Sequence, residues 1–450
     1  MRLPDDFIKL IEQKIGSAAA FLASLRQPPA TSIRLNPSKK TSAFDAHEQV
    51  PWHPSGRYLE ERPVFTLDPL FHAGTYYVQE ASSMLLYQAL LQTVDLNRNL
   101  KVLDLCAAPG GKSTLLAGAL SQGSFLLANE VIRKRIEPLQ HNLTKWGSQN
   151  VLISNHDPED FLPLKGFFDV VCVDAPCSGE GLFRKDPQAV DEWSLEHVDH
   201  CSARQKRILM GARDLVTEGG VLIYSTCTFN EEENDNNIQW LCQQGGFEAV
   251  ELTVVPAWGL TKTAFGYQCY PHLVKGEGFF LSVMRRTSAV AKTKTKLKPT
   301  ESAVPLAKKD RELIEPWIAE HERFSFFQKP NNEIVAVPNE LKENYALVSG
   351  ALKRRSSGLV IGSLKQRNFI PSHALALSEI IDPDLPGVSL EKEQALHYLR
   401  KDDIEISHPG KGWHLVRFEG FNLGWVKLLG NRYNNYLPNE WRIRMDIDKP

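Results

Sequence analysis

Short apolar runs and amphipathic stretches alternate through the middle of the chain. Between residues 100 and 286, helical patterns, notably Val131 to Trp146 and Ser202 to Val216, separate runs rich in β-branched residues. These runs are Lys101–Leu105, Phe125–Asn129, Val151–Ser154, Asp169–Val173 and Val221–Ser225. The alternation predicts an α/β domain on a parallel, doubly wound sheet. Two later runs, Phe247–Leu252 and Gly278–Met284, are expected to add an antiparallel pair.

The patterns before residue 100 are mixed. Asp5 to Leu25 carries apolar positions at helical spacing, and Ser32 to Asn36 alternates as a strand would. Pro51 to Pro69 is rich in loop-forming residues, and Tyr76 to Leu91 has a helical pattern. We therefore predict an α+β extension over residues 1–99.

A lysine-rich segment follows the sheet domain. Residues 287–309 place six lysines among Thr, Ser, Pro and Ala, which predicts a flexible linker. Residues 310–450 are expected to form a separate β-rich unit. Toward its end basic and aromatic residues interleave, as on surfaces that stack bases and neutralise phosphates: Trp413, Arg417, Trp425, Lys427, Arg432, Tyr433, Tyr436, Trp441, Arg442 and Arg444. A small β-rich core with a solvated face is the alternative interpretation.

Composition narrows the functional classes only moderately. The 450 residues include 52 Lys plus Arg and 54 Asp plus Glu, so a polyanionic partner would need a local basic patch. The N-terminus lacks an apolar signal core, and no run of about 18 apolar residues could span a membrane. We expect a cytoplasmic protein. The seven cysteines form no close C-x-x-C pairs, which favours reduced thiols and no metal site.

Two of the cysteines stand directly after apolar strands. Cys177 lies in D-A-P-C-S-G-E-G and Cys227 in Y-S-T-C-T-F. The carboxyl ends of strands in an open α/β sheet are where such sheets bind ligands, so both sulfurs should face one crevice. Two thiols over one substrate suggest covalent chemistry. The cysteines expected only to pack are Cys172, Cys201, Cys242 and Cys269.

A cofactor site is predicted after the first strand of the sheet. Asp104 to Thr114 reads D-L-C-A-A-P-G-G-K-S-T, a strand end, a small-residue loop and a helix start near Lys112. Such a loop suits the carboxylate of an amino-acid-like cofactor, and it lacks both G-x-G-x-x-G and a phosphate-loop motif. Glu130 is placed to bind ribose hydroxyls, and Asp157 could contact an adenine amine. Each acid could instead be a helix cap or a turn former.

Five motifs together carry a family resemblance. They are D-L-C-A-A-P-G-G-K-S-T, N-E at 129–130, D-A-P-C-S-G-E-G, F-R-K-D-P at 183–187 and Y-S-T-C-T-F-N-E-E-E-N at 224–234. The chain resembles the RNA cytosine-5 methyltransferases of the Sun (RsmB/RsmF-like) family. The resemblance implies a Rossmann-like methyltransferase sheet and a PUA-like RNA-binding tail. It also implies S-adenosylmethionine held by Cys106, Ala107, Ala108, Pro109, Gly110, Gly111, Lys112, Glu130, Arg135, Asp157 and Asp174.

The expected chemistry requires a nucleophile because carbon 5 of cytosine does not by itself accept a methyl group. The resemblance implies that Cys227 adds to carbon 6 and makes carbon 5 enamine-like. Asp174 could protonate or hydrogen-bond the cytosine edge. A base must then remove the carbon 5 proton, and the resemblance implies that Cys177 assists release of Cys227. Lys112 could orient the pair.

The substrate class follows from the geometry of this reaction. The target base must leave its stack, so single-stranded or locally opened nucleic acid is expected. The chain lacks the Glu-Asn-Val motif of DNA cytosine-5 methyltransferases, which favours RNA. The expected partner is small-subunit ribosomal RNA or an assembling small subunit. The protein itself is expected to be a monomer. Transfer RNA and a non-catalytic RNA-binding role are the alternatives. Candidate phosphate contacts are Arg34, Lys39, Lys40, Arg184, Lys185, Lys353, Arg354 and Arg355, with the linker lysines.

Overall fold

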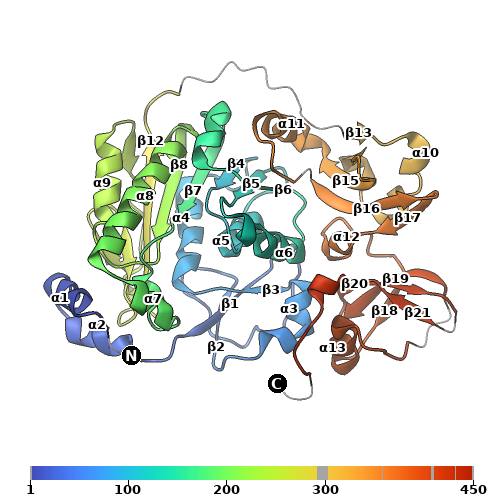
Figure 1. Ribbon diagram of the computed structural model, residues 1–450, viewed down its shortest axis with the longest axis horizontal. Helices are drawn as coiled ribbons and strands as arrows, with labels where there is room; N and C mark the ends of the chain where they lie inside the picture. The colour runs from blue at the N-terminus through green and yellow to red at the C-terminus, as the bar shows by residue number, and fades with distance from the viewer. Residues whose placement is uncertain (1–2, 291–302, 357, 407–409, 431, 448–450) are drawn as a thin grey trace.

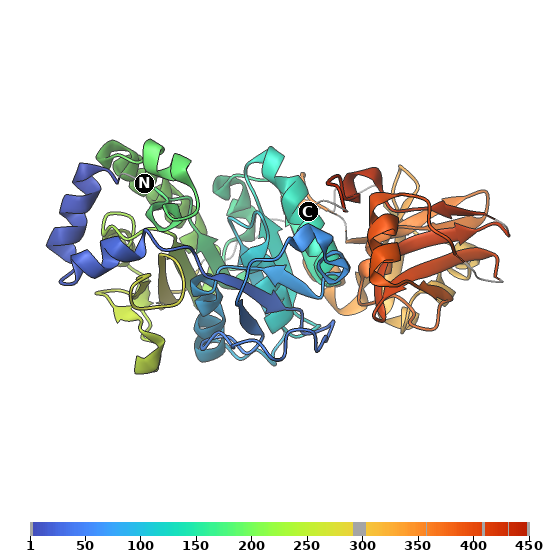
Figure 2. The ribbon, with the colours of Figure 1, turned by 90° about the horizontal axis from the view of Figure 1, so that it is seen from below.

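The computed structural model describes residues 3–290, 303–356, 358–406, 410–430 and 432–447. Within these ranges the strands form four sheets, and the strands of residues 303–447 lie to the right of the earlier ones in Figure 1. Seen from below, α1 (Asp5–Lys14) and α2 (Ala18–Ser24) lie at one end and the last sheet of the chain at the other (Figure 2). None of the described helices is both long enough and apolar enough to cross a membrane.

The central sheet has nine strands and is parallel over most of its width. Its order is β10-β11-β12-β8-β7-β4-β5-β6, with β9 paired to β12. The parallel strands are β4 (Lys101–Asp104), β5 (Phe125–Asn129), β6 (Val151–Ser154), β7 (Phe168–Asp174) and β8 (Val216–Thr226). The antiparallel strands are β9 (Phe247–Ala249), β10 (Thr261–Lys262), β11 (Tyr267–Cys269) and β12 (Phe279–Arg286). The predicted doubly wound sheet and its antiparallel addition are confirmed.

Both faces of this sheet are buried. Leu103 and Leu127 point to the face covered by α8 (Leu195–Arg213) and α9 (Asp235–Gln243). Their neighbours Val102 and Leu126 point to the face covered by α4 (Leu86–Thr93) and α5 (Gly111–Ala119). Covered parallel strands are continuously apolar, which is why these runs do not alternate.

Two predicted helices have different limits in the structure. The run from Val131 contains a 3₁₀ turn, Arg133–Arg135, before α6 (Ile136–Trp146). The helix predicted from Ser202 begins earlier, because the Ser194 hydroxyl accepts the His197 N–H at 3.0 Å and caps α8. It also ends before Val216, which starts β8.

The helix predicted over Tyr76 to Leu91 is wrong in its first part. Tyr76–Val78 forms β3, which pairs with β1 (Thr31–Leu35) beside β2 (Gly56–Leu59). Tyr and Val favour strands once a partner is present, and that partner lies some forty positions earlier. A 3₁₀ turn, Ser82–Leu85, and then α4 follow.

The C-terminal region contains two sheets. The first has five strands: β13 (Val304–Pro305), β14 (Phe324–Gln328), β15 (Glu333–Pro338), β16 (Leu359–Lys365) and β17 (Asn368–Pro371). The second has four: β18 (Gly387–Ser389), β19 (Gly412–Phe418), β20 (Phe421–Leu428) and β21 (Tyr433–Asn435). The helices of this region are α10 (Lys308–Arg311), α11 (Lys342–Ala351), α12 (His373–Leu377) and α13 (Lys392–Arg400).

Residues 310–450, predicted as a separate unit, share hydrophobic cores with the rest of the chain. Tyr345 of α11 packs on Phe125 of β5, with ring centroids 5.6 Å apart, inside the central core. Val426 of β20 shares another core with Ile33 and Leu70 of the N-terminal extension. The apolar faces of the C-terminal elements are therefore completed by the rest of the chain.

The predicted linker is partly structured. Residues 291–302, with Lys292, Lys294, Lys296 and Lys298, lie outside the described residues. Val304 and Pro305 form β13, and Lys308 and Lys309 begin α10. The predicted end of the linker at residue 309 therefore lies too far along the chain.

Candidate active site

The two cysteines meet at the carboxyl edge of the central sheet. Cys177 follows β7 and Cys227 follows β8, which are parallel neighbours, with Asp174 paired to Ser225 in register. The two Sγ atoms lie 2.9 Å apart, and both thiols are free. The Cys227 N–H also donates to the Cys177 sulfur at 3.4 Å. The two sulfurs are therefore adjacent at this edge of the sheet, as the positions of the cysteines after two strands predict.

Two buried glutamates tie the cysteine loops together. Glu180, in the Cys177 loop, accepts the N–H groups of Phe229 and Asn230 at 2.7 and 3.0 Å. Glu233, in the Cys227 loop, accepts the Ser178 N–H at 2.9 Å and the Gln205 amide at 2.7 Å. Each motif therefore uses its carboxylate to bind the backbone of the other. We call Glu180 and Glu233 the carboxylate clamp.

A close backbone contact completes this arrangement. The Gly181 N–H donates to the Cys227 carbonyl at 2.8 Å. A Cβ at Gly181 would lie 2.8 Å from that same oxygen and 2.7 Å from the Gly278 oxygen, so only glycine fits. From outside, Phe21 of α2 packs edge-on against Phe229 at 4.9 Å. The N-terminal extension therefore supports the Cys227 loop.

The electrostatics of the cysteine pair distinguish the two sulfurs. The hydrogen bond with Cys227 and then burial raise the pKa of Cys177 well above its ordinary value, so Cys177 keeps its proton at neutral pH. A protonated Cys177 can donate to Cys227 and stabilise negative charge on that sulfur. Burial likewise raises the pKa of Glu233, although its hydrogen bonds offset part of the effect.

A lysine–aspartate pair lies beside the sulfurs. The Lys112 Nζ is 2.7 Å from Asp174 Oδ2, and the Ser225 hydroxyl donates to Asp174 Oδ1 at 2.8 Å. Burial alone would lower the pKa of Lys112, but the attraction of Asp174 and, to a lesser extent, Asp104 and Cys227 raises it. Lys112 therefore carries a positive charge close to Cys227.

The predicted cofactor loop turns between β4 and α5. Gly110 has φ of 113°, a left-handed conformation that glycine permits, and it directly precedes α5. Arg135 links the loop to the end of β5: its Nη2 donates to the Ala108 carbonyl at 2.6 Å, and its Nη1 lies 3.3 Å from Glu130 Oε2. Cys106 to Lys112, Glu130, Arg135 and Asp174 are thereby brought to one edge.

Asp157 lies further along this edge, after β6. Its side chain accepts the Glu159 N–H at 3.2 Å, which caps a 3₁₀ turn over Pro158–Leu164, and it pairs with Arg207 at 3.3 Å. The capping alternative is therefore confirmed for Asp157, and its contact with adenine stays a prediction. Glu130 is buried, and its Oε1 accepts the Ile132 N–H at 2.8 Å.

Sequence reasoning missed several residues of the site. Asp104, at the end of β4, is fully buried; its Oδ2 accepts the Ser113 hydroxyl at 2.6 Å, and its Oδ1 has no hydrogen-bond partner among the described residues. Burial raises its pKa to about 7. Asp104, Glu180 and Glu233 all lie inside the recognised motifs, where an acid after an apolar strand was the available signal.

Three candidate phosphate contacts are wrong because their side chains are engaged inside the protein. Arg34 is buried and donates to Gln79 and Thr114. Lys39 donates to the carbonyls of Ala73 and Lys145, and Arg184 pairs with Glu277 at 2.8 Å. In the tail, Trp425 is 1% exposed, so it is a core residue rather than a base-stacking surface.

The chain is similar to known proteins over almost its whole length. Three family models match: "N-terminal domain of 16S rRNA methyltransferase RsmF" at residues 3–81, "16S rRNA methyltransferase RsmB/F" at 91–285 and "Methyltransferase RsmF PUA domain" at 386–443. Proteins named ribosomal RNA small subunit methyltransferase F are similar over 97% of both chains, at 31% identity in Aliivibrio fischeri and 32% in Aeromonas hydrophila.

Solved structures resemble part of the chain. A methyltransferase homologue from Pyrococcus horikoshii is 26% identical with a TM-score of 0.55, and covers 63% of this chain and 95% of its own. NSun6 from the same organism, solved with SFG, is 19% identical with a TM-score of 0.53 over 63% of this chain and 98% of its own, which supports the fold.

Proposed function

The chain belongs to the RsmB/F family of 16S ribosomal RNA methyltransferases, and we propose that it methylates carbon 5 of a cytosine in small-subunit ribosomal RNA. Members of this family are S-adenosylmethionine-dependent methyltransferases, and so is this protein. The observation that carries the cytosine-5 assignment is the Cys177–Cys227 pair, 2.9 Å apart, beside Lys112 at the cofactor edge. A methyl transfer to an already nucleophilic atom needs no such pair.

The residues at this edge fit S-adenosylmethionine, which supplies an electrophilic methyl group. Cys106 to Gly111 would hold its amino-acid part through the backbone, since the loop opens at the start of α5. The unpartnered Oδ1 of Asp104 suits an ammonium group. Glu130, already oriented by Arg135, suits the ribose hydroxyls, and Asp157 would contact the adenine amine.

In the proposed reaction, the Cys227 sulfur forms a bond to carbon 6 of the flipped-out cytosine. The carbon 5–carbon 6 electron pair would then bond the methyl carbon at carbon 5, while the bond from that carbon to the donor's sulfonium sulfur breaks and its electron pair stays on the donor sulfur. The positive charge of Lys112 lies close to the Cys227 sulfur, and the Cys177 sulfur lies 2.9 Å from it. Asp174, held by Lys112 and Ser225, would protonate or hydrogen-bond the cytosine edge.

Release requires a second set of bond changes. A base removes the carbon 5 proton, its electrons restore the carbon 5–carbon 6 double bond, and the bond to Cys227 breaks with its electrons returning to sulfur. Cys177 assists because its sulfur lies beside that bond. The carboxylate clamp would keep the two sulfurs adjacent throughout this cycle.

Ribosomal RNA is favoured over transfer RNA because the curated relatives similar over 97% of the chain are named for the small subunit. The PUA match supports RNA binding at the C-terminal end. We further propose that the protein acts in the cytoplasm as a monomer.

Bisulfite sequencing of total RNA from cells with and without the gene tests this proposal. We expect one or a few cytosines in small-subunit ribosomal RNA to lose protection in the deleted strain, and purified protein to restore them. Loss of protection confined to transfer RNA would contradict the ribosomal assignment. Methylation at another atom would contradict the cytosine-5 assignment.

A further inference from the structure

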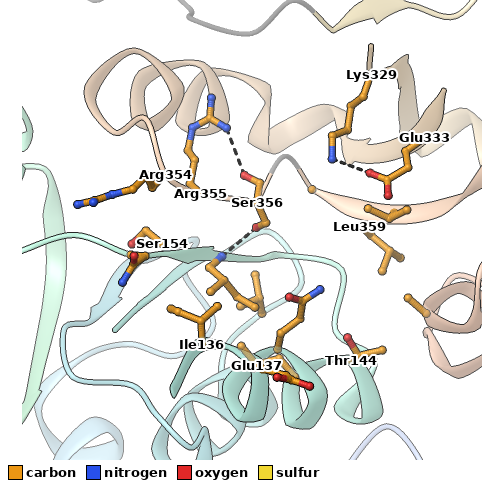
Figure 3. A pocket seen from close by; sticks show the side chains of 18 of the residues that line it. Ile136, Glu137, Thr144, Ser154, Lys329, Glu333, Arg354, Arg355, Ser356 and Leu359 are labelled. Atoms are coloured by element: carbon orange, nitrogen blue, oxygen red, sulfur yellow. Dashed lines mark hydrogen bonds and ion pairs between the residues drawn. The ribbon is translucent and has the colours of Figure 1, made fainter. Parts of the chain in front are cut away.

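A groove separates the β6 edge of the central sheet from the five-stranded sheet. It encloses about 880 Å³ between α6 and the end of β6 on one side and β15 and β16 on the other (Figure 3). Its charged lining residues are Arg133, Glu137, Lys329, Glu333, Arg354 and Arg355. Lys329 and Glu333 pair at 2.7 Å, which leaves three arginines against one glutamate. The groove is thus locally positive in a chain of net charge −2.

The two walls of the groove are joined by backbone hydrogen bonds. The Ser356 N–H donates to the Ile153 carbonyl at 2.8 Å, and the Asn155 N–H donates to the Arg354 carbonyl at 2.9 Å. Ser154 and Arg355 form an antiparallel bridge, so residues 354–356 extend the central sheet at its β6 edge. This pairing covers an edge that would otherwise be open, and it holds the groove at one width.

Two of the arginines are available to a ligand. The Arg354 side chain is 65% exposed, and its ion pair with Asp160 is long, at 3.8 Å. Arg133 is exposed in the turn before α6. Arg355 instead hydrogen-bonds the Ser349 hydroxyl and the Ser356 carbonyl, and so forms part of the wall. An arginine guanidinium binds phosphate through two parallel hydrogen bonds, which suits a polyanion.

The groove opens beside the cofactor edge. Arg133 lies three positions after Glu130, and Asn155, another lining residue, lies two before Asp157. From β6 to β8 the sheet order crosses four inter-strand steps of about 4.8 Å, so the groove lies roughly 19 Å from Cys227. A few nucleotides could connect the two places.

We propose that this groove binds the sugar–phosphate backbone of the substrate RNA a few nucleotides from the target cytosine, with Arg133 and Arg354 contacting phosphates. This inference rests on the proposed function. It assigns a role to the five-stranded sheet, which lies between the residues matched by the family models. The catalytic part and this sheet would then form one RNA surface, separate from the tail.

The test compares the full-length protein with the double variant Arg133→Ala/Arg354→Ala. The matched control is Arg98→Ala/Lys365→Ala, which removes two exposed cations outside the groove. Binding of naked small-subunit ribosomal RNA is measured over a range of salt concentrations. We expect the groove variant to bind about tenfold more weakly, and its salt slope to fall by about 1.4 for a single strand or about 1.8 for a duplex.

Cofactor affinity and saturated turnover should be unchanged in the groove variant, while KM for RNA rises. If the groove variant has the same RNA affinity and salt slope as the control variant, the groove is not an RNA-binding site. A defect seen with assembled subunits but absent with naked RNA would also overturn it, because it would indicate a ribosomal protein in the groove. Wild-type protein that neither binds nor methylates the RNA would instead overturn the proposed function.

Discussion

The cysteine loops and the β6 groove lie at two ends of the same sheet edge and are built differently. At the cysteine end, buried carboxylates bind backbone N–H groups and leave the reactive sulfurs little freedom. At the groove, exposed arginines stand on walls joined through the backbone. Bond formation requires reacting atoms held closely, whereas phosphate binding tolerates mobile charges. Substitutions should therefore act on turnover at one end and on RNA affinity at the other.

The largest effect is expected at the cysteine end. Cys227→Ala removes the nucleophile and should reduce methylation by roughly 10⁴-fold or more, with RNA and cofactor affinity retained. Cys242→Ala, a half-buried cysteine of α9, is the control and should keep near-wild-type activity. Transfer of labelled methyl groups to small-subunit RNA measures both. Substantial methylation by Cys227→Ala would show that the nucleophile lies elsewhere.

The next largest effect is expected at the carboxylate clamp. Glu233→Ala leaves the Ser178 N–H and the Gln205 amide without their acceptor, which should lower the free energy of unfolding by about 2–3 kcal/mol and reduce turnover. The neighbouring exposed Glu232→Ala serves as the matched variant. Chemical denaturation and single-turnover methylation report the two effects. Equal behaviour of the two variants would mean that the clamp does not hold the loops.

The proposed cofactor site lies between the two ends. Glu130→Ala should weaken S-adenosylmethionine binding by about tenfold to a hundredfold, since it loses ribose hydrogen bonds, while RNA affinity stays nearly intact. Exposed Glu159→Ala is the control. Calorimetry with cofactor and a separate RNA-binding assay make the comparison. Unchanged cofactor affinity in Glu130→Ala would remove this residue from the site.

Asp104 is expected to make the stability of the fold depend on pH. Asp104 has a pKa of about 7 in the fold, above its unfolded value of about 3.9, so the folded state binds more protons between these values. Its contribution to stability is full below about pH 4 and is lost by up to about 1.4 kcal/mol per pH unit as pH rises toward 7. Asp104→Asn should lack this slope. Parallel stability curves for wild type and variant would contradict the assignment.

The elements that the sequence predicts well are those whose pattern is local. The five parallel strands follow from short apolar runs, and the meeting of Cys177 and Cys227 follows from their positions after two of these strands. The two glutamates of the carboxylate clamp could have been proposed from the sequence, because both lie inside the quoted motifs. Their buried, reciprocal hydrogen bonds, however, depend on two loops fifty residues apart.

Long-range contacts explain the failures. Tyr76–Val78 becomes a strand only because β1 pairs with it. Arg34 resembles a surface cation in sequence, yet it is buried against Trp146, 4.4 Å from the ring centroid. The C-terminal region shares cores with elements three hundred positions earlier. A local sequence pattern does not show which distant residues will pack together. The groove could not be predicted for the same reason, because its walls come from distant parts of the chain.

The division of labour between the two sulfurs is tested most directly by trapping the covalent intermediate. Cys177→Ala and Cys227→Ala are each incubated with S-adenosylmethionine and small-subunit RNA and then separated on a denaturing gel. We predict a stable protein–RNA adduct in Cys177→Ala and none in Cys227→Ala, because only Cys227 attacks and only Cys177 helps to release. The reverse pattern would exchange the two roles, and methylation retained in both variants without any adduct would contradict the covalent mechanism.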